Sequence, residues 1–175
     1  MPIELRSERL RLAPIEPGDR EALHRIWTAP EVRRFLWDDR VIGLALVDDV
    51  IERSAASFAA EGFGHFALRT HAAEPLLGTC GLYRAEPGAE PELLYSLAPD
   101  QFGRGLATEA ARAVLDDAFA RLALARVRAR ADVPNHASIR VMQRLGMKCE
   151  GESREGGLQL VRYALAREAW RAPAR

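Results

Sequence analysis

The segment from Phe102 to Ala110 has residue types and a spacing that suit phosphate binding. Its two glycines, Gly103 and Gly105, allow the backbone to turn tightly and keep side chains away from a ligand. The helix predicted to follow begins with N–H groups that have no intrahelical acceptor. These amides and the positive end of the helix dipole together form a site for anions, most commonly phosphate. The alternative is a glycine turn that only connects two elements.

Asn135 and Ser138 are three residues apart, so they would lie on one face of a helix. Taken alone, Asn135 also suits a helix N-cap after Pro134, and Ser138 also suits a solvent-facing position. Glu109 is expected to complement the dipole of its helix. Three glutamates could act as a general base, although each also suits an ordinary surface position: Glu92, Glu152 and Glu155.

Length and composition limit the possible classes of protein. The 175 residues are enough for one domain with a sizeable core and too few for two. Basic and acidic residues balance, 25 against 25, which argues against a nucleic-acid partner. No apolar run approaches the roughly 18 residues of a membrane helix and no apolar signal region opens the chain, so we expect a cytoplasmic protein without a membrane partner. The two cysteines suggest no disulfide framework, and the four histidines lack metal-ligand spacing, so we expect no metal.

Hydrophobic periodicity and turn residues predict elements in the order β-α-α-β-β-β-α-β-α-β-β. We expect strands at 5–15, 64–70, 76–83, 92–95, 126–131, 147–151 and 158–165, and helices at 19–27, from 47 to near Gly62, at 106–122 and at 135–145. Pro30 is expected to end the first helix, and an aromatic loop at 35–39 to follow. The arginines at 126, 128 and 130 alternate along one strand and predict a solvated face. Residues 1–170 should form the single domain, and 171–175 a disordered tail.

Four segments, spread over nearly the whole chain, form a recognisable set: Glu8–Pro14, Arg33–Trp37, Phe102–Ala110 and Asn135–Met147. In this order they resemble the GNAT superfamily of acetyl-CoA-dependent N-acetyltransferases, most closely its ribosomal-protein N-acetyltransferase-like branch. The sequence departs from the pattern at two positions. Phe102 stands where the superfamily has Gln or Arg, and Met147 replaces the usual Phe after Gly146. The segment 152–157 is also short compared with that of the branch.

The resemblance implies an α/β (α+β) fold with a single GNAT-type domain. Its central sheet would be mixed and mostly antiparallel, with about seven strands and helices on both faces. The implied activity moves an acetyl group from acetyl-CoA to a primary amine, by direct attack in a ternary complex. The acceptor would be a protein N-terminus or a small-molecule amine. The protein would act as a monomer or a homodimer.

The resemblance also implies roles for particular residues. Acetyl-CoA would be held by a loop, a strand end and a helix that together comprise Ser96, Leu97, Ala98, Phe102, Gly103, Arg104, Gly105, Leu106, Ala107, Thr108, Asn135, Ser138 and Arg140. Amides at 102–108 would bind the pyrophosphate, and those at 96–98 would polarise the thioester oxygen. The expected catalytic residues are Ser138 as proton donor to the thiolate, Asn135 as holder of the pantetheine arm, and Glu92 as a candidate base. The acceptor pocket would contain Trp27, Phe35, Trp37 and Asp38, with Asp39 beside them.

Two alternatives remain at this point. Gly103 and Gly105 form half of a dinucleotide-binding fingerprint, with Asp132 as a possible ribose partner, which would indicate an oxidoreductase. Against it, Thr108 stands where the third glycine belongs, and only one helical crossover is predicted. The other alternative is a non-catalytic protein of the same fold that binds acyl-CoA, because no base is firmly assigned.

Overall fold

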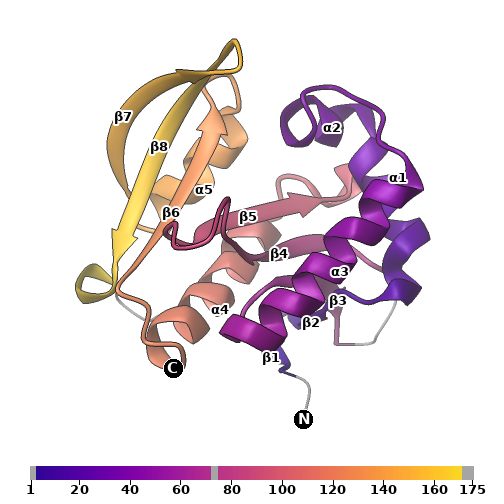
Figure 1. Ribbon diagram of the computed structural model, residues 1–175, viewed down its shortest axis with the longest axis horizontal. Coiled ribbons are helices and arrows are strands. Elements are labelled where there is room, and N and C mark those ends of the chain that lie inside the picture. Colours follow the sequence, from indigo (N-terminus) through magenta and orange to yellow (C-terminus); the bar gives the residue numbers. More distant parts are fainter. Residues whose placement is uncertain (1–2, 72–74, 171–175) are drawn as a thin grey trace.

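The structure is a computed structural model, and it describes residues 3–71 and 75–170. One open sheet of eight strands runs in the order β1-β2-β3-β4-β5-β6-β8-β7 (Figure 1). The strands are β1 (Leu5–Arg6), β2 (Leu10–Pro14), β3 (His65–Thr70), β4 (Gly78–Tyr83), β5 (Glu92–Leu97), β6 (Arg126–Asp132), β7 (Lys148–Glu155) and β8 (Leu158–Ala166). The α-helices are α1 (Arg20–Thr28), α2 (Pro30–Leu36), α3 (Leu44–Glu61), α4 (Leu106–Ala120) and α5 (His136–Arg144). Within the described residues, no helix is long and apolar enough to cross a membrane. The predicted tail at 171–175 lies outside the described residues.

The predicted architecture, a mixed α/β domain with helices on both faces of one sheet, is confirmed, but the sheet has eight strands rather than about seven. The strand predicted at 5–15 is divided into β1 and β2 by a turn at residues 7–9. The Ser7 amide donates to the Leu10 carbonyl at 2.9 Å and closes this turn. Residues 6–9 contain no apolar residue, and Leu5 is out of phase with Leu10 and Leu12, so the alternation supports a strand only from Leu10 onward.

The aromatic segment at 35–39 is partly helical, which differs from the predicted loop. The first helix, α1, ends at Thr28, before Pro30 as predicted, and Pro30 also occupies the first turn of α2, where its missing N–H needs no acceptor. Phe35 lies near the end of α2, and Trp37 is its C-cap residue. A short helix therefore holds these aromatic side chains.

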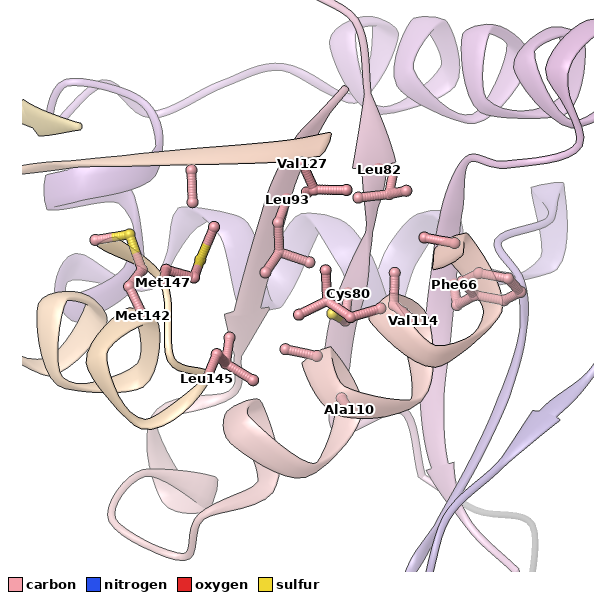
Figure 2. Packing of buried hydrophobic residues seen from close by; sticks show 14 of the residues in the cluster. Phe66, Cys80, Leu82, Leu93, Ala110, Val114, Val127, Met142, Leu145 and Met147 are labelled. Carbon is pink, nitrogen blue, oxygen red and sulfur yellow. The ribbon is translucent and has the colours of Figure 1, made fainter. Parts of the chain in front are cut away.

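Two apolar layers enclose the sheet, one under α4 and α5 and the other under α1, α2 and α3 (Figure 1). In the first layer, Ala110 and Val114 of α4 and Met142 of α5 pack with Leu93 and Val127 of the sheet (Figure 2). Burial of a side chain such as leucine or valine stabilises the fold by about 1.5–3 kcal/mol. The two helices are thus fixed against the strands that precede them.

Strands β5 and β6 form the point around which the molecule opens. They are the only parallel neighbours in the described sheet, and their ladder consists of one register pair, Glu92 with Arg128. By contrast, β6 pairs with β8 along its whole length, from Arg126 to Asp132. Beyond Glu92 the two parallel strands therefore diverge, and their carboxyl ends lie apart (Figure 1).

Where β5 and β6 still lie side by side, arginines and glutamates form a row of ion pairs. Arg126, Arg128 and Arg130 share one face of β6, as predicted, and each pairs with glutamates of neighbouring segments. Arg126 and Arg128 both contact Glu90, at 2.8 and 3.3 Å. About a third of each arginine side chain is exposed. Pairs of this kind stabilise by roughly 0–1 kcal/mol each, so their main effect is to align the strands.

A histidine at the start of β3 makes the stability of the fold depend on pH. Burial lowers the pKa of His65 to about 4, and its ring stacks on that of Tyr83 with centroids 6.2 Å apart. In the unfolded chain the pKa is about 6.5, so below that pH the unfolded state binds a proton that the folded state excludes. Stability contributed by neutral His65 is therefore complete above pH ~6.5 and is lost as the pH falls toward ~4.

We expect the free energy of unfolding to fall by about 2 kcal/mol between pH 7 and pH 4.5 because of His65 alone. Urea unfolding of the unmodified protein and of His65→Gln at both pH values would isolate this contribution. The variant should lose less stability over the same interval, since glutamine does not titrate. An equal loss in both proteins would show that other groups cause the dependence.

Candidate active site

The divergence of β5 and β6 creates a cleft of about 1440 Å³ that collects most of the predicted site residues. Its lining includes, from the predicted set, Trp27, Phe35, Trp37, Asp38, Glu92, Ser96, Leu97, Phe102, Gly103, Gly105, Leu106, Ala107, Thr108, Asn135, Ser138 and Arg140. Ala98 and Arg104 do not belong to this lining. Ala98 instead lines a smaller cavity beside α1. The cleft therefore joins the phosphate loop, the end of β5, the start of α5 and the aromatic residues of α1 and α2.

The glycine loop presents a row of unpaired amides to this cleft. Gly103 and Gly105 have φ angles of 73° and 76°, which favour glycine, and Gly105 is the N-cap residue of α4. Among the described residues, none accepts a hydrogen bond from the amides at 103–108. The Phe102 amide differs, because it donates to the Pro99 carbonyl at 3.2 Å. The prediction that every amide from 102 to 108 is available to a ligand is therefore wrong for Phe102, and the unpaired amides are those at 103–108.

A buried hydroxyl lies with these amides. Thr108 lines the cleft, and its Oγ1 atom is buried and has no hydrogen-bond partner in the described structure. Buried polar atoms in native proteins nearly always have a partner, so an unpaired one suggests a site for a ligand. Free N–H donors, an unpaired hydroxyl and the N-terminus of α4 suit an anionic group such as a pyrophosphate.

The loop is held in place by the turn between β1 and β2. The Glu109 carboxylate accepts hydrogen bonds of 2.7 Å from the Ser7 hydroxyl, the Arg9 amide and the Arg9 Nε atom. The Arg9 guanidinium also donates to the Arg104 carbonyl at 3.1 Å. Burial acts to raise the pKa of Glu109, but the hydrogen bonds from Ser7 and Arg9 outweigh it and lower that pKa. Glu109 thus fixes the start of α4 in addition to complementing its dipole.

The end of β5 offers fewer free amides than predicted. The Ala98 amide donates to the Leu77 carbonyl at 2.8 Å, so the prediction that it is available to a ligand is wrong. N–H groups alternate in direction along a strand, so the Ser96 amide also faces β4. The Leu97 amide faces the opposite side, where β6 has already diverged. Leu97 is therefore the only one of the three predicted amides directed toward the cleft.

The Ser96 side chain binds other side chains within the fold. Its Oγ atom accepts a hydrogen bond from Trp27 Nε1 at 3.1 Å and lies 2.9 Å from Thr79 Oγ1. Trp27 meets Trp37 edge to face, with ring centroids 5.8 Å apart. Trp37 Nε1 is buried and has no partner among the described residues. Ser96 thus positions the aromatic wall of the cleft.

Asn135 and Ser138 lie at the start of α5 and are joined to β5 by a residue that the sequence did not reveal. Asn135 is the N-cap residue, and its Oδ1 accepts the Ser138 amide at 3.2 Å, as the simpler interpretation of Asn135 predicted. The Tyr95 Oη atom lies 2.8 Å from Ser138 Oγ and 3.0 Å from the Ser138 carbonyl oxygen. The only available signal was that a buried tyrosine hydroxyl usually has a partner.

The three glutamates considered as bases occupy different environments. Glu92 accepts a hydrogen bond from Tyr83 at 3.0 Å and pairs with Arg130 at 3.2 Å, and its side chain is 17% exposed. Glu155 also lines the cleft and pairs with Arg130, at 2.8 Å. Glu152 does not line the cleft, and it accepts a hydrogen bond from Gln159 at 2.7 Å. Only Glu92 combines partial burial with a place on β5.

Two further carboxylates face each other across the cleft. Asp132 ends β6, and Asp38 follows α2 with a φ angle of 52°. Burial raises the pKa of Asp132, and the negative charge of Asp38 raises it further. Within the described residues, neither side chain has a hydrogen-bond or ion-pair partner, whereas Asp39 pairs with Arg33 at 2.9 Å. The pair places negative charge at the mouth of the cleft, beside Trp37.

Comparison of the sequence and of the fold with those of known proteins shows the family to which the chain belongs. The model of the acetyltransferase (GNAT) domain matches residues 9–148. The chain belongs to the GNAT acetyltransferase family. An uncharacterized N-acetyltransferase of Bacillus licheniformis, p20, is 28% identical over 153 residues, which cover 86% of this chain and 85% of that protein.

Solved structures of acetyltransferases share the fold of this family member. One from Agrobacterium tumefaciens has a TM-score of 0.82 at 24% identity and covers 93% of this chain and 94% of its own. RimL, a ribosomal L7/L12 alpha-N-protein acetyltransferase in complex with coenzyme A, has a TM-score of 0.77 at 18% identity, covering 91% and 95%. The predicted resemblance to the GNAT superfamily, with a ribosomal-protein acetyltransferase among its neighbours, is confirmed.

The oxidoreductase alternative is wrong. Membership of the acetyltransferase family excludes it, and so does the sheet, which has one parallel pair in its described part instead of the repeated crossovers of a dinucleotide-binding fold. Asp132, its proposed ribose partner, lies instead at the mouth of the acetyltransferase cleft.

Proposed function

We propose that this GNAT acetyltransferase moves an acetyl group from acetyl-CoA to a primary amine by direct attack in a ternary complex. One observation supports it above the others: a single cleft is lined by Leu97, by Ser138 and by the loop residues with unpaired amides at 103 and 105–108. Acetyl-CoA supplies an acetyl group activated as a thioester. The RimL structure, whose fold this chain shares, holds coenzyme A and lends the proposal further support. As the sequence predicts, we place the protein in the cytoplasm as a monomer or homodimer.

The phosphate loop would bind the pyrophosphate of coenzyme A. The amides from Gly103 to Thr108 donate to it, and the unpaired Thr108 hydroxyl adds one donor. The dipole of α4 contributes roughly 0.3–1 kcal/mol toward binding an anion at its N-terminus. Arg104 and Arg140 are exposed near the cleft and would add long-range attraction for the negative charges. The clamp from Arg9 to Glu109 keeps the amides in place before binding occurs.

The Leu97 amide would polarise the thioester carbonyl, because its N–H faces the divergence of β5 and β6. One such donor contributes about 100- to 1000-fold in rate. Ser138 would donate a hydrogen bond to the sulfur as it departs. Asn135 would hold the pantetheine arm through its side-chain NH₂ group, because its Oδ1 already caps α5.

The acceptor amine would enter beside Trp27, Phe35 and Trp37. Asp38 and Asp132 would attract its ammonium form, and Glu92 would take a proton from it through water. Since a lysine-like ammonium has a pKa of about 10.4, most of the acceptor arrives protonated at neutral pH. Carboxylates along the route would therefore serve both capture and deprotonation.

We expect Asp132→Asn and Asp38→Asn each to raise KM for a cationic amine by about fivefold, corresponding to a loss of roughly 1 kcal/mol. KM for acetyl-CoA should stay within twofold, since neither residue belongs to the phosphate loop. Steady-state kinetics at low and high salt would check this, because screening should shrink the effect. Asp39→Asn is the matched control, since Asp39 is paired with Arg33. Equal KM values in all four proteins would contradict this role.

Isothermal titration of acetyl-CoA into the purified protein tests the proposed function first. Saturable binding followed by release of free thiol with a panel of primary amines would establish transfer. Binding without turnover on any amine would favour the non-catalytic acyl-CoA-binding alternative. Absence of binding would refute the assignment of the loop and of the activity together.

A further inference from the structure

Tyr95 connects the sheet to Ser138, the serine proposed to donate to the departing thiol. Its side chain leaves β5 on the α5 side, where it packs with the apolar layer, and its Oη atom approaches both oxygens of Ser138. The O–O distance of 2.8 Å to Ser138 Oγ is that of a good hydroxyl hydrogen bond, and the carbonyl oxygen lies at 3.0 Å. One phenol is therefore fixed against a single residue of α5.

The hydrogens of the two hydroxyl groups can be arranged in two ways. In the first, Tyr95 donates to the Ser138 carbonyl and Ser138 donates to Tyr95, so the serine has no hydrogen for the cleft. In the second, Tyr95 donates to Ser138 Oγ, and the serine hydrogen is free to point into the cleft. The two arrangements differ only by rotation about two C–O bonds.

Resting on the proposed function, we infer that Tyr95 is a positioning residue that turns the Ser138 hydroxyl toward the developing thiolate. As negative charge grows on the sulfur, the second arrangement becomes the stable one, because Ser138 then donates to the thiolate while accepting from Tyr95. Hydrogen bonds in such a chain polarise and strengthen one another. No proton leaves either hydroxyl, so the sulfur departs as a hydrogen-bonded thiolate and takes its proton later from water.

The surroundings of Tyr95 agree with a role as a donor only. Burial raises its pKa well above the ordinary value, and the hydrogen bond with Ser138 only partly opposes this shift. The phenol therefore keeps its hydrogen throughout the working pH range. A second buried phenol that reaches α5, Tyr163, accepts a hydrogen bond of 3.5 Å from the Gln143 side chain, and within the described residues it makes no hydrogen bond to Ser138.

The pKa of the thiol of bound coenzyme A, followed through the ultraviolet absorbance of its thiolate, tests this role without an acceptor. The unmodified protein should lower that pKa, whereas Tyr95→Phe and Ser138→Ala should each raise it by about one unit, a tenfold change. The double variant should match Ser138→Ala alone. With an amine, Tyr95→Phe should lower kcat about tenfold and leave KM for acetyl-CoA within twofold. Tyr163→Phe, the matched control, should change neither quantity.

Several outcomes would overturn the inference. A bound thiol whose pKa is the same in Tyr95→Phe as in the unmodified protein would do so. A double variant whose thiol pKa rises by the sum of the two single effects would also overturn it. If Tyr95→Phe does not fold, Ser138→Ala decides alone, since an unchanged thiol pKa there rules out any role that acts through Ser138. Failure of coenzyme A to bind the unmodified protein would instead refute the proposed function, and this inference with it.

Discussion

Replacing Gly105 with glutamate is expected to abolish measurable binding of acetyl-CoA, with a Kd at least about 100-fold higher, a loss of roughly 2.7 kcal/mol. Gly105 is the N-cap residue of α4, with a φ angle of 76°, and its neighbours hold the unpaired amides. The new carboxylate would take the place of the pyrophosphate at the N-terminus of α4. Arg9 Nη2 lies 3.8 Å from the position of a Cβ atom, but this guanidinium already binds Glu109.

Two matched variants separate the causes of that loss. Gly105→Ala introduces only the backbone strain of a positive φ angle, about 1–2 kcal/mol, and Gly105→Gln adds bulk without charge. We expect affinity to fall in the order Ala, Gln, Glu, as measured by calorimetry, with thermal unfolding to confirm that each variant folds. Retained affinity in Gly105→Glu would refute the assignment of the loop. Equal losses in Gln and Glu would show that bulk rather than charge is decisive.

Replacing Glu92 with glutamine is expected to lower kcat by about 100-fold at pH 7 and to remove the acidic limb of the pH–rate profile. A positioned general base contributes roughly 100- to 10,000-fold, and Glu92 is the candidate carboxylate that lies on β5 within the cleft. The structure adds a partner on each side, Tyr83 and Arg130. Burial raises the pKa of Tyr83 and the charge of Glu92 raises it further, so the phenol remains a donor.

Glu155 provides the sharpest control for Glu92, because both carboxylates pair with Arg130. Glu155→Gln should disturb the same guanidinium while leaving kcat within about threefold, and Glu152→Gln should have no effect. A similar loss in Glu92→Gln and Glu155→Gln would mean that Arg130, and not proton transfer, links them. If no variant shifts the acidic limb, none of the three glutamates is the base, and Asp132 is the next candidate.

The two sides of the cleft differ in how they are held. At the glycine loop, proposed to bind the coenzyme, Glu109 receives hydrogen bonds from Ser7 and Arg9, so residues about a hundred positions away fix the loop before any ligand arrives. On the side proposed to receive the acceptor, Asp38 and Asp132 have no such partners among the described residues. This contrast agrees with a common donor on one side and a variable amine on the other.

Much of the fold and of the coenzyme side follows from local sequence signals. The glycines 103 and 105 between a strand and a helix, the Asn135 cap and the end of α3 at Gly62 all reflect interactions within a few residues. The four-segment resemblance then placed these elements in order. The loop predicted at 35–39 was wrong for a local reason, since Pro30 both follows the end of α1 and occupies the first turn of α2.

The sequence by itself determined which segments turn, cap and alternate, because backbone conformation depends mainly on neighbouring residues. Only the tertiary structure decided which polar groups remain free. The Ala98 amide donates its hydrogen bond to the Leu77 carbonyl, and the Ser138 hydroxyl is within hydrogen-bond distance of the Tyr95 hydroxyl. These contacts depend on strand order, on register and on the early divergence of β5 from β6. Hydrogen bonds form between groups that packing brings within about 3 Å, and no local pattern specifies which partner from a distant segment will arrive there.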